Sequence, residues 1–194
     1  MLAAMLIANV LHAAQPTAPP PYAPAVPSGV EVSSKVRLYD IRGSTMSTLR
    51  RQMKRRGPIK WAAYTRWFLS WNWETERRDG QCHLVVPEAS VRVKFRFPSW
   101  LPSEAADEAT VRAYDSYAAG LWVHETGHAD IAVDTATKIV SDLEGLPPRD
   151  TCRLLRKDAA DVSLAHYRRA GITEKAYDRD TDHGATQIYG PSPR

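Results

Sequence analysis

Residues 121–130 read LWVHETGHAD, and they lie inside a stretch with helical spacing that runs to about Leu143. His124 and His128 are four positions apart, so their side chains leave nearly one face of a helix, about 40° of rotation apart. Two imidazoles placed in this way can bind one metal ion, and Zn²⁺ accepts imidazole nitrogen readily. From its position beside His124, Glu125 can take a proton from a water on the metal. The H-E-x-x-H pattern therefore predicts a zinc site on a long helix.

Strand character precedes this helix in three places. Residues 36–41 read VRLYDI, and two later stretches alternate with a period of two on either side of a turn at Asp79-Gly80. The alternate positions that share a face in these two stretches are Thr65, Trp67, Leu69, Trp71 and Trp73, and then Val91, Val93, Phe95 and Phe97. The tryptophans could form a substrate platform, but core packing accounts for most of them. We expect an α+β fold with a small N-terminal mixed or antiparallel sheet.

A short helix is predicted between the first two strands, over Met46–Arg55, with Ser44 or Thr45 as its cap and Gly57-Pro58 as its stop. This helix is strongly basic. Such a cluster could bind nucleic acid or anionic lipid, but a solvated face is the more ordinary interpretation. The basic residues are Arg50, Arg51, Lys54, Arg55 and Arg56.

The long helix is predicted to begin at a Ser103 cap, with Glu104 and Asp107 in its first turn, and to end before Gly145. Because it is unusually long, a kink near Gly120 is an open alternative. A second helix is expected from Arg149 to Ala170, stopped by Gly171. The last 20 or so residues are expected to be irregular.

The 194 residues suffice for one domain, which we place at residues 31–190. The apolar run of residues 1–14 is too short to span a bilayer and predicts a signal peptide. Residues 15–30 are proline-rich and predict an extended linker. The net charge of +4 does not by itself indicate nucleic acid. We therefore expect a periplasmic or secreted protein without a membrane span and without a nucleic-acid partner.

The chain has two cysteines, Cys82 and Cys152. An even count in an exported protein favours a disulfide, whereas two buried thiols are the alternative. The bridge would close a loop of about 70 residues, which contributes on the order of 4 kcal/mol in the chain-entropy model.

A hydrolytic zinc site usually has three protein ligands and a water. Asp130 and Asp134 point away from the histidine face of the helix, so the third ligand must come from elsewhere. Of the remaining candidates His183 stands out, because the glycine after it allows close approach to a metal. Asp178 or Asp182 could then orient an imidazole as hydrogen-bond partners. The full set of candidates is His83, His166, Asp178, Asp182 and His183.

The chain resembles a family of secreted zinc-dependent proteases catalogued as domain of unknown function 922, because several motifs occur in the same order. The resemblance covers about Val32 to Gly184. The motifs include Tyr-Asp-x-x-Gly at Tyr39, Gly57-Pro58, Pro98-x-Trp100, H-E-x-x-H and Tyr-Asp-x-x-Thr-x-His-Gly at Tyr177. The family is grouped with zincin-like metallopeptidases. The resemblance implies a zincin-like fold, His124 and His128 as ligands, Glu125 as catalytic base, and the histidine of the last motif at His183.

We therefore expect a zinc metallopeptidase with one Zn²⁺ per chain, held by His124, His128 and His183, that acts on a peptide or protein substrate. Tyr177 is a candidate donor to the oxyanion of the tetrahedral intermediate, with simple packing as the alternative role. Two other classes compete with this hypothesis. One is a non-catalytic zinc protein with a closed coordination shell, and the other is an envelope-binding module that uses the basic helix and the tryptophan strand.

Overall fold

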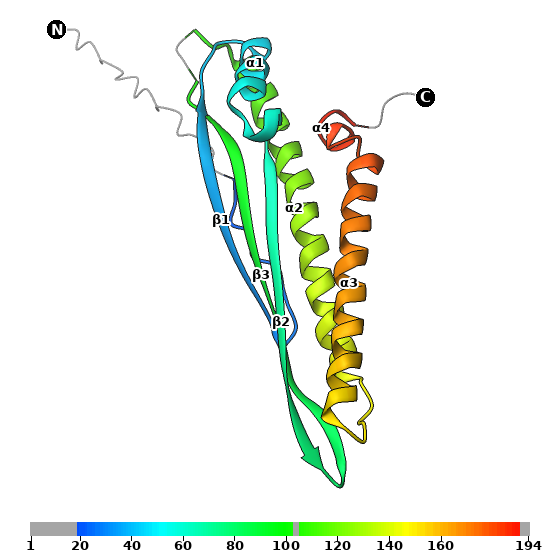
Figure 1. Cartoon of the computed structure of the whole chain (residues 1–194). Coiled ribbons are helices and arrows are strands. Elements are labelled where there is room, and N and C mark those ends of the chain that lie inside the picture. Colours follow the sequence, from blue (N-terminus) through cyan, green and yellow to red (C-terminus); the bar gives the residue numbers. More distant parts are fainter. Residues whose placement is uncertain (1–18, 103–104, 191–194) are drawn as a thin grey trace, which may run out of the picture.

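The computed structural model describes residues 19–102 and 105–190. In these residues a three-stranded sheet lies along one side of the molecule, and two long helices run along the sheet (Figure 1). The chain is thus a mixed α+β fold, as the alternating stretches predicted. The elements in chain order are β1 (Val30–Ile41), α1 (Met46–Arg56), a 3₁₀ turn (Pro58–Lys60), β2 (Tyr64–Arg78), β3 (Gln81–Trp100), α2 (Glu108–Glu144), α3 (Cys152–Asp180) and α4 (Ala185–Tyr189).

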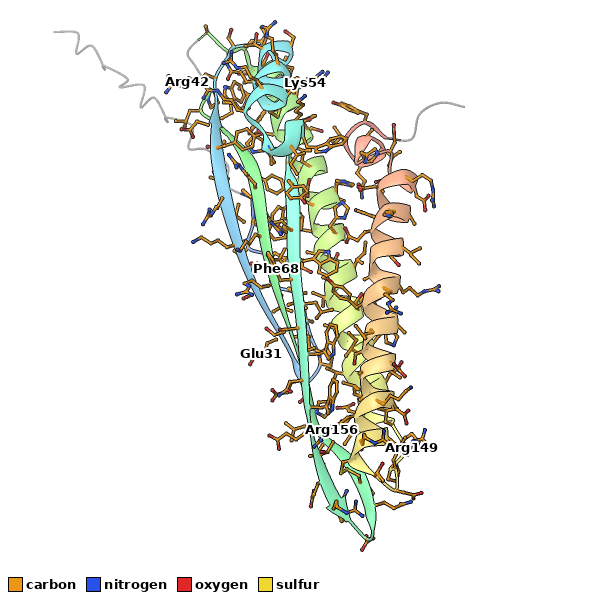
Figure 2. The ribbon with its side chains drawn as sticks, viewed as in Figure 1. Glu31, Arg42, Lys54, Phe68, Arg149 and Arg156 are labelled. Carbon is orange, nitrogen blue, oxygen red and sulfur yellow. A yellow bond between two sulfur atoms is a disulfide. The ribbon has the colours of Figure 1, made fainter. Side chains whose placement is uncertain are left out.

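The sheet has the order β1-β3-β2, with β1 parallel and β2 antiparallel to the central strand. β2 and β3 form a long hairpin whose turn is Asp79-Gly80, both at positive φ. The predicted alternation is confirmed, because one face of β3 is buried against α2 while Arg92, Lys94 and Arg96 are exposed. Side chains fill the space between the sheet and the two long helices (Figure 2). The buried face of β3 consists of Val91, Val93, Phe95 and Phe97.

Helix α1 closely matches its prediction, with Thr45 as cap and an end one residue later than expected. Helix α2 differs at its start. Its cap is Asp107, whose carboxylate accepts from the Thr110 amide at 2.7 Å, whereas Ser103 lies outside the described residues. The helix also continues without interruption past Gly120, where a Cβ would meet the backbone of Ile188 in α4. Gly120 thus allows two helices to approach closely and introduces no kink.

Helix α3 is longer than predicted. It begins at Cys152 with Thr151 as cap and runs through Gly171 to Asp180. A glycine in an exposed helix costs only about 1 kcal/mol relative to alanine, and contacts beyond it outweigh this cost. Trp67 of β2, for example, donates to Glu174 at 3.0 Å. The predictions that this helix stops at Gly171 and that the last 20 or so residues are irregular were therefore wrong for residues 171–180, and about three further turns of helix carry groups of the candidate site.

The described part of the proline-rich segment is extended, but it is attached to the domain. The Tyr22 hydroxyl donates to Asp130 at 2.8 Å, and the Tyr22 ring lies 5.6 Å from that of Phe95. Residues 19–29 therefore run along the folded domain instead of forming a free linker. The predicted signal peptide, residues 1–14, lies outside the described residues.

Cys82 and Cys152 form a disulfide, with their Cα atoms 5.1 Å apart. The bridge joins the start of β3 to the start of α3, next to a backbone pairing between Cys82 and Arg149. It confirms the pairing predicted from the sequence. Among the described residues, none of the helices combines the length and the hydrophobicity needed to cross a membrane.

The double substitution Cys82→Ser with Cys152→Ser is expected to lower the free energy of unfolding by about 4 kcal/mol, because the unfolded chain regains the freedom of a 70-residue loop. Denaturant titration of both proteins measures the difference. Reducing agent should destabilise the wild type by a similar amount and leave the double variant unchanged. A difference below about 1 kcal/mol would show that the bridge does little for stability.

Candidate metal centre

His124 and His128 leave the same face of α2 toward the C-terminal part of α3. Each imidazole is oriented through its Nδ1 atom. His124 Nδ1 lies 3.0 Å from Gln187 Oε1, and His128 Nδ1 lies 2.8 Å from Glu174 Oε2. Because both partners accept hydrogen bonds there, each Nδ1 carries the proton in the neutral imidazole. Both Nε2 lone pairs are therefore free, and the two Nε2 atoms are 3.3 Å apart.

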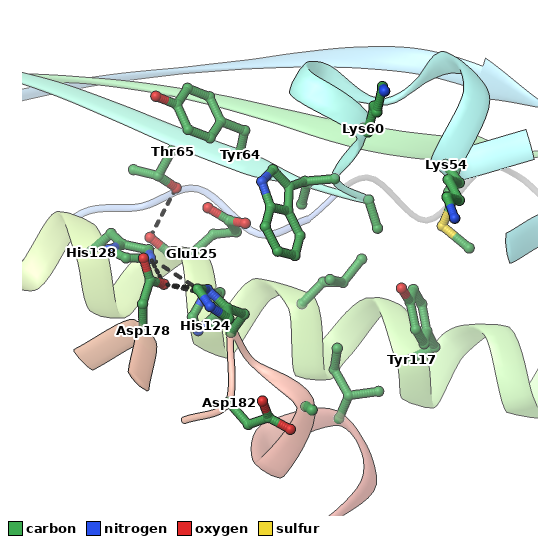
Figure 3. A pocket seen from close by; sticks show the side chains of 18 of the residues that line it. Lys54, Lys60, Tyr64, Thr65, Tyr117, His124, Glu125, His128, Asp178 and Asp182 are labelled. Atoms are coloured by element: carbon green, nitrogen blue, oxygen red, sulfur yellow. Dashed lines mark hydrogen bonds and ion pairs between the residues drawn. The ribbon is translucent and has the colours of Figure 1, made fainter. Parts of the chain in front are cut away.

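Asp178 of α3 provides the third candidate ligand atom, an oxygen, at the same point. Its Oδ1 lies 3.4 Å from His124 Nε2 and 3.2 Å from His128 Nε2. Figure 3 shows the carboxylate facing both rings. In a tetrahedral zinc site with bonds of about 2.0–2.1 Å, neighbouring ligand atoms are about 3.3 Å apart. The three atoms of His124, His128 and Asp178 thus have the spacing that Zn²⁺ requires.

The charges of the three groups also suit a cation. Two neutral Nε2 atoms and a carboxylate are all acceptors, so their close approach requires a cation or protons between them. Burial, together with the neighbouring His128, holds the pKa of His124 below its usual value. Burial also lowers the pKa of His128, but its hydrogen bond to Glu174 and the nearby carboxylates outweigh burial and raise it. The residues therefore fit a divalent metal with N and O ligands.

Glu125 lies beside this cluster and is almost completely buried, with 5% of its surface exposed. Burial raises the pKa of Glu125 to about 7. The Thr65 hydroxyl donates to the Glu125 carbonyl at 3.0 Å and ties β2 to this turn of α2. Glu125 lines a cavity of about 670 Å³ that also reaches the two histidines and Asp178 (Figure 3). A carboxyl group with a pKa near neutrality, next to these candidate metal ligands, is suited to move protons.

Tyr177 packs behind the cluster instead of facing the cavity. Its ring is stacked on His124 at 5.2 Å, and its hydroxyl donates to the His124 carbonyl at 3.2 Å and accepts from Gln187 Nε2 at 2.8 Å. A Cβ on Gly127 would overlap this hydroxyl, which explains the glycine inside H-E-T-G-H. The Tyr177 hydroxyl thus has two partners within the fold, and its role as an oxyanion donor stays a prediction.

His183 lies next to the cluster but outside the set of atoms that converge. Its Nδ1 is 3.7 Å from Asp178 Oδ1, its side chain is 53% exposed, and its ring is stacked on Trp61 at 5.2 Å. The following Gly184 has a φ of +87°, and a Cβ at this position would lie only 2.8 Å from Cγ of His124. The glycine thus allows the loop to pack on His124. The third position near the two Nε2 atoms belongs to Asp178, which was among the sequence candidates for the third ligand but was preferred there as a hydrogen-bond partner.

The sequence profile of the family described as "Bacterial protein of unknown function (DUF922)" matches residues 36–184. The chain belongs to this family. The match extends from β1 to the end of the loop before α4 and so includes every residue of the cluster. No curated protein and no solved structure matches the chain. The family description assigns no activity, so the DUF922 site is interpreted from its own geometry.

The other sequence candidates in this DUF922 chain lie away from the three ligand atoms. His166 pairs with Asp142 at 2.7 Å, and His83 is on the β2–β3 hairpin, paired with Glu76. Asp182 lines the cavity but forms none of the hydrogen bonds that orient the two imidazoles.

Two residues that orient the imidazoles, Glu174 and Gln187, were not anticipated from the sequence. Glu174 precedes Asp178 by four positions, which places both on one face of α3. That spacing would have identified Glu174 if the helix had been extended past Gly171. Gln187 belongs to the five-residue helix α4, and no spacing in the sequence marks it.

Proposed function

We propose that this DUF922 protein is a zinc-dependent peptidase in which His124, His128 and Asp178 hold one Zn²⁺ and Glu125 acts as general base. The observation that carries the proposal is the spacing of 3.2–3.4 Å among three acceptor atoms of these ligands, beside a buried carboxyl group in a cavity. His183 remains an alternative third ligand from the sequence. The zincin-like relationship that the motifs imply is part of the same proposal.

Bound zinc would supply Lewis acidity, which lowers the pKa of water toward about 7 and polarises a carbonyl oxygen. The chain's own residues do the remaining work. Gln187 and Glu174 keep each Nδ1 protonated and each Nε2 available. Glu125 accepts a proton from the attacking water and then returns it to the leaving amine. The buried position of Glu125 keeps its carboxyl group near the pKa that both transfers need.

A peptide substrate suits the walls of the cavity. β2 is an edge strand of the described sheet, and Tyr64 and Thr65 at its start line the cavity beside Glu125. An edge strand offers backbone N–H and C=O groups with which an extended peptide can pair. Pairing there would place a peptide carbonyl along the cavity that contains the metal ligands. We further propose that the protein acts outside the cytosol, as the disulfide favours.

Peptide cleavage by the purified protein tests the proposal. A peptide mixture from a digested proteome is incubated with the protein, and new termini are identified by mass spectrometry. We expect cleavage that disappears after the metal is removed with a chelator and returns when zinc is added. Stoichiometric zinc binding without any cleavage would contradict the peptidase and favour the non-catalytic zinc protein. Cleavage that is insensitive to chelation would contradict the zinc mechanism.

A further inference from the structure

The outer face of the sheet, which points away from α2 and α3, carries a concentrated positive charge. It bears six exposed cations from all three strands. Six positive charges exceed the net charge of +4 of the whole chain, so the remainder of the chain is net negative. Four carboxylates on the same face lie toward the end where β1 begins and along the hairpin beyond it: Glu31, Glu74, Glu76 and Glu88. The six cations, named here the basic sheet face, are Lys35, Arg37, Arg66, Arg92, Lys94 and Arg96.

The strand register places like charges directly opposite one another. Lys94 of β3 faces Lys35 on one side and Arg66 on the other, and Arg37 faces Arg96. Like charges opposite each other on a sheet are destabilising. Within residues 19–102 and 105–190, no carboxylate forms a salt bridge with any of the six. Salt bridges among the described residues therefore do not offset the repulsion between these facing cations.

Phe68 of the edge strand β2 lies at one border of the basic sheet face, directly opposite Arg92 of β3 (Figure 2). Arg66, Arg92 and Lys94 lie around its ring, with their charged atoms 5.0–5.5 Å from the centroid. Such cation–π contacts hold the side chains near the sheet and limit how far they can spread apart. The charges thus form an array that extends across all three strands, with an aromatic ring at its border.

We infer that the basic sheet face binds the phosphate-bearing surface of an anionic lipid bilayer. An exposed array of cations on one face of the sheet is complementary to a surface of anionic headgroups, and every lysine or arginine near such a surface adds to binding. The Cys82–Cys152 bridge supports lipid over nucleic acid, because disulfides persist outside the cytosol, where membranes present abundant phosphate. The inference does not depend on the proposed peptidase, since none of the six cations lines the metal cavity.

Sedimentation with lipid vesicles tests the inference on the full chain. The protein is mixed with vesicles of phosphatidylcholine containing roughly one-third phosphatidylglycerol, and with vesicles of phosphatidylcholine alone. We expect binding only to the anionic vesicles, decreasing steeply as salt is raised. Binding through an apolar segment would not discriminate between the two. Equal binding to both vesicles, or no binding to the anionic ones at low salt, would overturn the inference.

A triple variant with Lys35→Gln, Arg66→Gln and Lys94→Gln locates the surface. Each lysine or arginine is worth roughly fivefold in partitioning at an anionic bilayer, so binding should fall by more than tenfold. The variant should fold, because neutralisation removes the facing like charges, and thermal unfolding verifies this. The matched control is Arg51→Gln, Lys54→Gln and Arg55→Gln on α1, which removes the same charge elsewhere and should keep most of the binding.

Two further outcomes would overturn the inference. Greater loss in the α1 control would transfer the lipid-binding surface to the basic helix. Tighter binding to a DNA duplex than to anionic vesicles at the same salt concentration would identify the face as a nucleic-acid surface.

Discussion

Glu125→Gln is expected to reduce peptide cleavage by about 10²- to 10⁴-fold while zinc remains bound at one per chain. Glutamine has nearly the shape of glutamate but cannot accept the proton of the attacking water. Glu125 is not among the atoms that converge on the proposed metal position, so metal content should not change. The measurements are kcat/KM on a cleaved peptide and zinc content by elemental analysis.

Folding should not confound this experiment. Burial raises the pKa of Glu125 to about 7, so the charged form is disfavoured where it lies and a neutral isostere is tolerated. Glu144→Gln is the matched control, because Glu144 is an exposed glutamate at the end of the same helix. It should leave kcat/KM unchanged. If Glu125→Gln kept wild-type kcat/KM, Glu125 would not be the base and the proposed mechanism would be wrong.

Asp178→Ala is expected to weaken zinc binding by more than about 100-fold, beyond the 10- to 100-fold that follows loss of an orienting residue. His183→Ala should change the affinity less than tenfold, since the His183 ring is stacked on Trp61 outside the converging atoms. Asp180→Ala is the control, because this exposed carboxylate on the same helix pairs with Arg179. Competition with a zinc chelator of known affinity measures all three variants.

The pattern across these variants separates the remaining possibilities. Zinc lost only in His183→Ala would show that the ligand inferred from the sequence is right and that Asp178 orients it. Zinc lost in both Asp178→Ala and His183→Ala would indicate four protein ligands. Such a closed shell has no position for a water or a substrate, and it would favour the non-catalytic zinc protein over the peptidase.

The sequence predicted those parts of the molecule that follow from local periodicity. The four-residue spacing of His124 and His128 gave their common helix face, and alternation gave the buried side of β3. The disulfide followed from cysteine count and an expected export signal. These predictions succeed because every piece of information lies within one element or in the composition.

The position of Asp178 beside the two histidines depends on information that lies between elements. Gly171 is an ordinary stop signal, and nothing in the nearby residues shows that contacts such as that of Trp67 with Glu174 carry α3 past it. With the helix ended early, Asp178 was placed in an irregular tail. Its shared face with Glu174 was therefore not visible. Gly184 was likewise interpreted as allowing His183 to approach a metal. In the structure the same glycine allows the loop to pack against His124 of α2.

The division of the centre between two helices has a thermodynamic consequence. His124 and His128 are joined by one turn of helix, whereas Asp178 follows His128 by some fifty residues and approaches it only when α3 packs on α2. In the unfolded chain the two histidines stay close in sequence, but the Asp178 oxygen is not held near them. Binding of the proposed Zn²⁺ and association of the two helices would therefore be linked equilibria. Zinc binding and helix association would stabilise each other by the same free energy. A higher zinc concentration would therefore increase the fraction of molecules in which α3 is packed on α2.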